Sequence, residues 1–220
     1  MIKHHPTHEL LSAFAAGNCS PAQALILSAH VDMCPRCRQL TRAQEDCLAE
    51  KAFAHSAQTD EAFDLMLQNI TRLPQQQGES VAPTHQVLTL DGREFKLPRA
   101  LQRYASKVDS WSHTVGKLWQ AKVDLGAQGR ADFIYMENGG SVPEHTHRGS
   151  ELTLVLDGEF SDGVGTYETG DFLSLGAEHT HAPRSDVEEG CLVFSIVDKP
   201  LHFTSGWARL LNPFSHLFFK

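Results

Sequence analysis

Residues 139–158 read GGSVPEHTHRGSELTLVLDG. His145 and His147 are two positions apart, so on an extended strand both side chains point to the same face. Glu151 follows after three residues and opens a run of β-forming residues, and glycines mark turns at either end. With His181 further along the chain, this stretch predicts a metal site of three imidazoles and a carboxylate, a set that tends to build an open, responsive centre. Such ligands accept Zn, Fe, Mn, Ni or Cu and do not by themselves choose the metal.

The rest of the C-terminal half consists of short apolar runs separated by turn residues. The turns include Asp91-Gly92 and Asp157-Gly158. Many short strands at hairpin spacing predict an all-β barrel or jelly roll rather than a parallel sheet. The clearest runs are residues 86–90, 117–123, 131–136 and 152–156.

The first 73 residues show the periodicity of helices instead. Ser20-Pro21-Ala22-Gln23 predicts a helix start, because it offers a serine N-cap, a proline at the first helical position and the glutamine of a capping box. The expected fold class is therefore α + β, with a small helical domain of about four helices before an all-β domain. We expect the helices at residues 8–16, 21–30, 35–54 and 60–73. The last is amphipathic through Phe63, Met66, Leu67, Ile70 and Leu73.

A second set of metal-binding residues, His30-x-x-x-Cys34-x-x-Cys37, lies where two predicted helices meet. The start of a helix carries partial positive charge, which favours the thiolate form of cysteine. A C-x-x-C beside a histidine, without the βαβ context of a redox pair, is typical of a structural zinc. Tetrahedral zinc needs a fourth ligand. The candidates are His4, His5 and His8.

Composition narrows the class of protein. The 220 residues are 41% hydrophobic and 21% charged, as in an ordinary globular protein, and the length suits two small domains. A net charge of -8 argues against direct binding of nucleic acid. The N-terminus lacks an apolar signal core, and no run approaches the roughly 20 apolar residues of a membrane span. Five cysteines, an odd number, suit a reducing compartment, so we expect a cytoplasmic protein without membrane contact.

The stretch from Pro74 to Pro83 is rich in proline, glycine and polar residues, as flexible tethers are. It separates the helical pattern from the strand pattern. We therefore expect a helical domain over residues 1–73, a linker over 74–84 and a β domain over 85–220.

The N-terminal pattern resembles the zinc-binding anti-sigma domain of bacterial anti-sigma factors, over roughly residues 1–73. The resemblance implies that an N-terminal histidine, His5 rather than His4, is the fourth ligand. It also implies that the helix from Asp60 to Leu73 is an arm that helps to clasp a sigma factor. The alternative is a helix packed on its own domain. The implied zinc ligands are His5, His30, Cys34 and Cys37.

The C-terminal half resembles the cupin family. Its first motif is matched at every fixed position, by Gly139, His145, His147, Glu151 and Gly158. The second motif is partial, because Gly176 and Glu178 replace the usual proline and glycine and Pro183 stands near the usual asparagine.

The second cupin motif opens correctly with Gly170-Asp171, and His181 stands where the last histidine ligand of the family belongs. His179 competes with His181, because residues two apart share a face of a strand. The implied cupin ligands are His145, His147, Glu151 and His181.

The combination of both halves resembles ChrR-type anti-sigma factors over nearly the whole chain. It implies a regulatory protein, not an enzyme, that restrains an extracytoplasmic-function sigma factor of the RpoE type and releases it on an oxidative signal such as singlet oxygen. The expected cofactors are zinc in the N-terminal site and a divalent metal in the cupin, zinc before Fe, Mn or Ni. The rival hypotheses are a metal-dependent dioxygenase and a cupin that binds a small molecule without turnover. The oligomeric state stays open.

Overall fold

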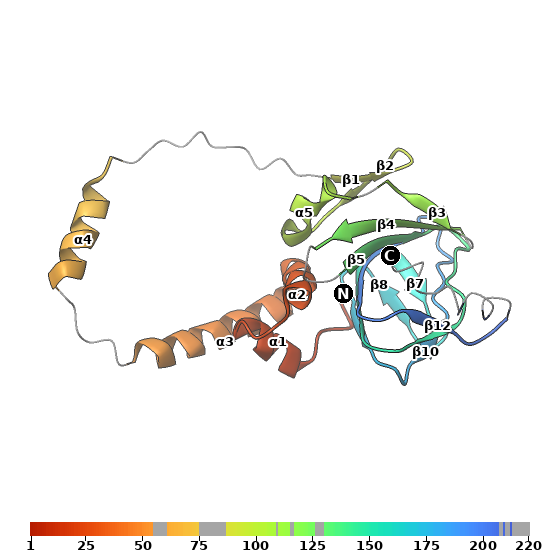
Figure 1. Cartoon of the computed structure of the whole chain (residues 1–220), viewed down its shortest axis with the longest axis horizontal. Coiled ribbons are helices and arrows are strands. Elements are labelled where there is room, and N and C mark those ends of the chain that lie inside the picture. Colours follow the sequence, from red (N-terminus) through yellow and green to blue (C-terminus); the bar gives the residue numbers. More distant parts are fainter. Residues whose placement is uncertain are drawn as a thin grey trace.

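The computed structural model describes residues 1–54, 61–74, 87–108, 110–114, 117–125, 130–206, 209 and 212. Helices come first in the chain, and antiparallel strands that build a barrel follow them (Figure 1). The α + β class predicted from the sequence is confirmed. None of the described helices is long and apolar enough to cross a membrane.

Four helices form within the described N-terminal residues. The second begins with the expected capping box: Ser20 Oγ accepts the Gln23 N–H at 3.3 Å, and Gln23 Oε1 accepts the Ser20 N–H at 3.0 Å. This helix runs past the predicted end near His30, because the Cys34 N–H still bonds the His30 carbonyl at 2.8 Å. His30 thus lies in its last turn, beside the start of the next helix. The helices are α1 (His8–Ala15), α2 (Pro21–Met33), α3 (Pro35–Phe53) and α4 (Glu61–Arg72).

The β part contains a large antiparallel sheet in the order β3-β4-β5-β11-β7-β8, with β9 paired to β7. Two smaller sheets have the orders β10-β6-β12 and β1-β2. A short helix, α5 (Arg99–Ala105), follows β2. This helix was not predicted from the sequence. The strands are β1 (Val87–Leu90), β2 (Arg93–Lys96), β3 (Ser112–Thr114), β4 (Leu118–Asp124), β5 (Arg130–Met136), β6 (His145–His147), β7 (Glu151–Ser161), β8 (Thr166–Glu168), β9 (Phe172–Leu175), β10 (Thr180–His181), β11 (Cys191–Val197) and β12 (Leu201–Phe203).

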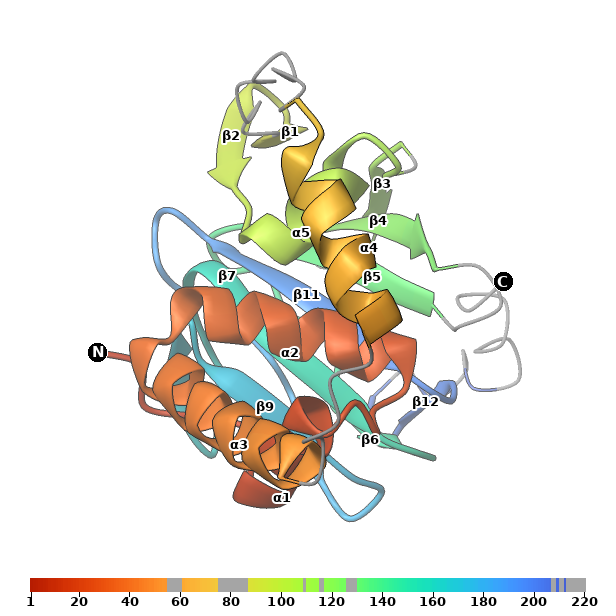
Figure 2. The same cartoon turned by 90° about the vertical axis from the view of Figure 1, so that its left-hand side faces the viewer.

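The helical part and the barrel share one hydrophobic core. Helix α2 lies across the large sheet and contacts β7 and β11 (Figure 2). Its Ile26 and Leu27 are fully buried in the same cluster as Phe133, Leu154 and Phe194 of the sheet. The two parts therefore pack together as well as being joined by the chain. The predicted linker falls almost wholly on residues 75–84, outside the described residues, so the predicted domain limits stay a prediction.

Helix α4 stands clear of this body (Figure 1). Every residue from Glu61 to Arg72 is exposed. The structure therefore does not pack this helix on its own domain, which was one of the two expectations for it. Its exposed apolar side chains are Phe63, Leu65, Met66, Leu67, Ile70 and, just beyond its end, Leu73.

Candidate metal centres

The first candidate centre lies where α2 and α3 meet the N-terminal segment. Cys34 is the N-cap of α3, and its Sγ accepts the Cys37 N–H at 3.5 Å. His30 Nε2 lies 3.3 Å from Cys37 Sγ. His5 Nδ1 lies 3.5 Å from Cys34 Sγ and 3.4 Å from Cys37 Sγ. The four ligand atoms lie within 4.8 Å of one another, so the structure brings together all four residues implied by the resemblance.

The other N-terminal histidines point elsewhere. The His4 ring packs edge-on against Tyr167 of β8, with ring centroids 4.9 Å apart. His8 is exposed and contacts Ser12 and Gln44. Of the three N-terminal candidates, only His5 reaches the sulfurs. Metal binding by these residues stays a prediction.

The chemistry of this group suits zinc. Burial, with His5 nearby, lowers the pKa of His30 to about 4, so its imidazole is neutral and ready to bind a metal. Burial, with the Cys34 side chain beside it, raises the pKa of the Cys37 thiol to about 12, so a metal must displace that proton. A nitrogen and a sulfur bound to one tetrahedral zinc at the usual bond lengths lie about 3.5 Å apart. The nitrogen–sulfur separations of 3.3 to 3.5 Å in this group are close to that spacing.

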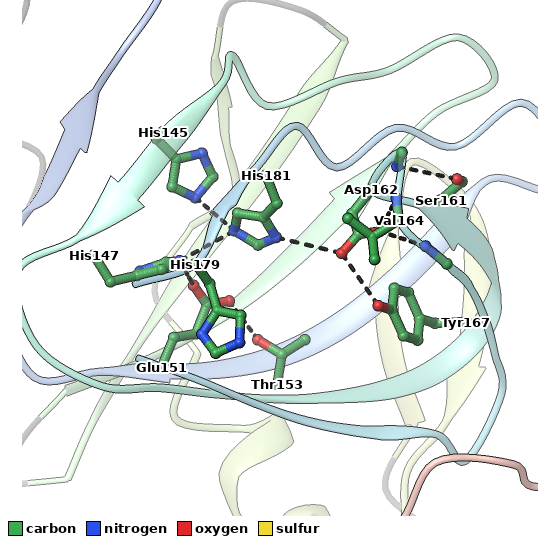
Figure 3. A network of polar contacts seen from close by, with 12 residues as sticks. His145, His147, Glu151, Thr153, Ser161, Asp162, Val164, Tyr167, His179 and His181 are labelled. Atoms are coloured by element: carbon green, nitrogen blue, oxygen red, sulfur yellow. Dashed lines mark hydrogen bonds and ion pairs between the residues drawn. The ribbon is translucent and has the colours of Figure 1, made fainter. Parts of the chain in front are cut away.

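The second candidate centre lies inside the barrel (Figure 3). His145 and His147 lie on β6 with both side chains buried, as the alternation predicts. His181 on β10 pairs in register with His145, and Glu151 opens β7. His181 Nε2 lies 3.0 Å from His145 Nε2 and 3.1 Å from His147 Nε2. Glu151 Oε2 lies 3.0 Å from His147 Nε2, so one oxygen and three nitrogens face a common point.

The competing histidine, His179, does not join this group. Its Nδ1 accepts the Gly176 N–H at 3.0 Å and lies 3.1 Å from Glu178 Oε1. The ring is about half exposed. Glu178 and Gly176 are residues where the chain departs from the cupin motif, and here they hold His179 in a surface turn. That His181 is the ligand stays a prediction, which this arrangement favours.

The charges of the barrel cluster favour a bound cation. Burial lowers the pKa of His145 and of His147, and burial together with its two histidine neighbours lowers the pKa of His181 to about 3. His145 Nδ1 donates to the Pro143 carbonyl at 2.8 Å, which leaves its Nε2 as the acceptor nitrogen. Neutral imidazoles whose lone pairs converge repel one another unless a cation lies between them. The group therefore fits a divalent metal.

Side chains that the sequence analysis did not single out support this cluster. Thr153 Oγ1 donates to Glu151 Oε1 at 2.6 Å, and Ser195 Oγ on β11 donates to the same oxygen at 3.3 Å. On the other side, Asp162 Oδ2 lies 3.9 Å from His181 Nδ1 and accepts the Tyr167 hydroxyl at 3.2 Å (Figure 3). The spacing of Glu151 and Thr153 was a usable signal, because residues two apart on a strand share a face.

A small cavity of about 70 Å³ adjoins the cluster. Besides cluster residues it is lined by apolar side chains, among them Ile134, Val142, Phe160 and Val193. Sites for drug-sized ligands measure about 300 to 1,000 Å³. This chamber has room only for a very small molecule.

Comparison with known proteins gives matches to both halves. A family model of the ChrR cupin-like domain matches residues 117–199, and a zinc-finger family model matches residues 6–38. The anti-sigma-E factor ChrR of Cereibacter sphaeroides is 29% identical over 216 residues, which cover 97% of this chain and 98% of that protein. The solved structure of Rhodobacter sphaeroides SigE in complex with the anti-sigma ChrR matches with a TM-score of 0.69 and 25% identity, covering 90% of this chain and 100% of that one. The chain therefore carries a zinc-finger-type segment before a ChrR cupin-like domain, and over nearly its whole length it is similar to the anti-sigma factor ChrR.

Proposed function

We propose that this protein holds an extracytoplasmic-function sigma factor of the RpoE type inactive and releases it on an oxidative signal, such as singlet oxygen. The observation that carries the proposal is similarity along 97% of the chain to a protein named as an anti-sigma-E factor. The related solved structure is of ChrR in complex with SigE, which supports a sigma factor as partner. We place the protein in the cytoplasm, where a sigma factor meets RNA polymerase.

The helical domain, residues 1–73, is the part that we propose to bind the sigma factor. Helix α4 supports this, because its apolar side chains face solvent. Exposed apolar patches of this kind mark protein interaction sites. The linker, residues 74–84, then joins the sigma-binding domain to the cupin domain, residues 85–220.

We assign the two metal centres different tasks. A structural zinc bound by His5, His30, Cys34 and Cys37 holds the helical domain together, because it links the N-terminal segment to α2 and α3. A divalent metal, zinc before Fe, Mn or Ni, bound by the cupin cluster marks the place where the signal arrives. Its ligands are His145, His147, Glu151 and His181.

The size of the barrel chamber supports a small signal. A cavity of about 70 Å³ suits a molecule as small as dioxygen better than an organic substrate. Release then requires that the signal changes the relative free energies of the sigma-bound and sigma-free states. A non-covalent effector typically supplies 1 to 3 kcal/mol, and covalent oxidation supplies more.

Co-expression of the chain with its sigma factor, followed by purification of the complex, tests this division of tasks. His30→Ala or Cys34→Ser should abolish co-purification, whereas His145→Ala or Glu151→Gln should leave the complex intact and block its release by singlet oxygen. Cys47→Ser and His179→Ala are matched controls, because both side chains are exposed and lie outside the two centres. A complex that survives deletion of residues 1–73, or cupin variants that no longer bind the sigma factor, would contradict the proposal.

A further inference from the structure

The N-terminal segment, residues 2–5, lies against the turn that joins β8 to β9. Asp171 in this turn is fully buried. Its Oδ1 accepts the backbone N–H groups of Lys3 at 2.7 Å and His4 at 3.0 Å, and its Oδ2 accepts the Glu168 N–H at 2.9 Å. In return, the Phe172 N–H donates to the His4 carbonyl at 3.1 Å. The start of the chain is therefore bonded to the barrel through both the N–H and the carbonyl group of His4.

Further contacts fix the same segment. Lys3 Nζ pairs with Glu168 Oε1 at 2.5 Å. The Ile2 side chain covers Gly170, where a Cβ atom would lie 2.5 Å from Ile2 Cδ1 and where φ is +95°. Only a glycine suits that position, because it combines a left-handed backbone with the close approach of Ile2. These contacts all come from the cupin part of the chain.

The buried Asp171 is held as a carboxylate. Burial by itself opposes the charged form, yet the backbone N–H donors of His4, Glu168 and Lys3 lower the pKa of Asp171 below its ordinary value. A charged acceptor makes stronger hydrogen bonds than a neutral one. Asp171 is therefore well suited to hold a chain terminus, which is poorly ordered unless it is tied down.

The residue directly after this bonded segment is His5, which faces the sulfurs of Cys34 and Cys37. The same turn also touches the site through Phe172, whose ring packs edge-on against the His30 ring at 5.6 Å. Both cysteines come from the start of α3. In contrast, His30 packs on Phe172 of the cupin part, and His5 directly follows His4, which is bonded to that part.

We propose that Asp171 is a positioning residue of the N-terminal zinc site: through the β8–β9 turn the cupin domain holds residues 2–5, so that His5 completes the ligand set. Without this turn, the backbone entropy lost on ordering the segment would reduce the affinity for the metal. The turn also connects the two centres. On one side of the turn, β9 pairs with β7 and places Leu175 opposite Glu151. On the other side, Tyr167 of β8 packs on His4 and donates to Asp162, which lies beside His181.

Cobalt(II) titration of the full-length chain tests the proposal. Of the two candidate centres found among the described residues, the N-terminal one contains cysteines and the cupin one does not. A sulfur-to-cobalt charge-transfer band therefore reports metal binding at the N-terminal centre. Asp171→Ala should weaken cobalt and zinc binding at this site about tenfold, the lower end for residues that orient a metal ligand. The band should also change toward the spectrum of the His5→Ala variant. Thr169→Ala is the matched control and should bind as the wild type does, because it removes an exposed side chain from the same turn whose hydroxyl donates to the Gly158 carbonyl at 3.3 Å.

A double-mutant cycle separates positioning from general damage. If Asp171 acts through His5, Asp171→Ala should cause no further loss of affinity in a His5→Ala background. Additive losses, or wild-type affinity in Asp171→Ala, overturn the proposal. The positioning role of Asp171 rests on the zinc site proposed above, but different results would contradict each of them. If the wild-type chain shows no thiolate-to-cobalt band, the zinc site itself is refuted.

A second variant leaves the barrel unchanged in case Asp171→Ala does not fold. Deleting Ile2 and Lys3 removes the cover of Gly170, one backbone donor to Asp171 and the Glu168 ion pair, and keeps His4 and His5. This variant should also bind cobalt more weakly than the wild type. Unchanged affinity in a folded deletion variant counts against the proposal in the same way.

Discussion

At the scale of single residues, the barrel centre depends on side chains that are not among its four candidate ligands. Glu151 lies in the barrel wall, and burial raises the pKa of its carboxyl group, while Thr153 and the other donors to it act in the opposite direction. Thr153 Oγ1 donates to Glu151 and lies 3.0 Å from Ser195 Oγ. These hydroxyls contact one carboxylate oxygen of Glu151, and the other oxygen faces the histidines.

Replacing Thr153 by valine keeps the shape of the side chain and removes the donor. We expect about tenfold weaker metal binding at the cupin centre, because the supporting partner of a ligand typically contributes that much. Competition with a chelator, for a chain whose Cys34 and Cys37 are replaced, measures the affinity. Thr146→Val is the matched control, since Thr146 lies between the two histidines on β6 and donates to the Ala177 carbonyl instead. Equal affinities of the two variants would rule out this role for Thr153.

At the scale of elements, α4 differs from every other helix described. The other helices each bury at least one side chain, whereas α4 buries none. Helices in proteins are stabilised mostly by packing of an apolar face, so a 12-residue helix with an exposed face is marginal alone. Its regular apolar spacing therefore indicates a surface for a partner, in agreement with the clasp expected from the resemblance.

Substitutions on α4 should separate binding from folding. Phe63→Ala and Ile70→Ala should each weaken binding of the sigma factor at least tenfold, because buried apolar anchors dominate interface energies. The free energy of unfolding should change by less than about 0.5 kcal/mol, as is usual for surface positions. Gln68→Ala on the same helix is the control. Calorimetric titration and urea denaturation measure the two effects, and unchanged sigma affinity in both variants would show that α4 is no part of the interface.

At the scale of the whole molecule, the helical part and the barrel form one packed unit. Helix α2 is buried on several sides, with α1 and α3 on one flank and β7, β11 and α5 on the other. A change in the core of α2 is therefore expected to affect both the helical part and the barrel. This packing gives a physical route by which an event in the barrel can reach the helical domain, besides the route through the N-terminal segment.

Leu27→Ala should destabilise both parts together. Leu27 is fully buried, so its truncation should cost about 2 to 5 kcal/mol, whereas Leu48→Ala at an exposed site serves as the control. Far-ultraviolet circular dichroism follows mainly the helices, and tryptophan fluorescence follows the β part, because residues 1–73 contain no tryptophan. Coincident transitions, both moved to lower denaturant, are expected. A helical signal that is lost first, with the fluorescence transition unmoved, would mean that the parts unfold independently.

Much of the site was predictable because it depends on local spacing. The capping box at Ser20, the C-x-x-C at the start of α3 and the alternation of His145 and His147 follow from helix and strand periodicity, which needs no tertiary information. Helix α5 was not predicted, because it is only seven residues long and has no side-chain cap. The sequence named Asp171 only as part of the second cupin motif. Its bonds to Lys3 and His4 were not predicted, because those backbone groups are 168 and 167 positions away and leave no pattern in the sequence.

The sequence by itself determined the order of helices before strands and the amphipathic spacing of α4, and it indicated the two clusters of candidate ligands, since each follows from residue type and period. Only the tertiary structure places His181 rather than His179, and His5 rather than His4, in the two clusters, because the local spacing of each pair is equivalent. It also decided that α2 shares a core with the barrel and that the first residues of the chain are bonded to Asp171. Those features depend on contacts between distant segments, and such contacts form only when the whole chain has folded.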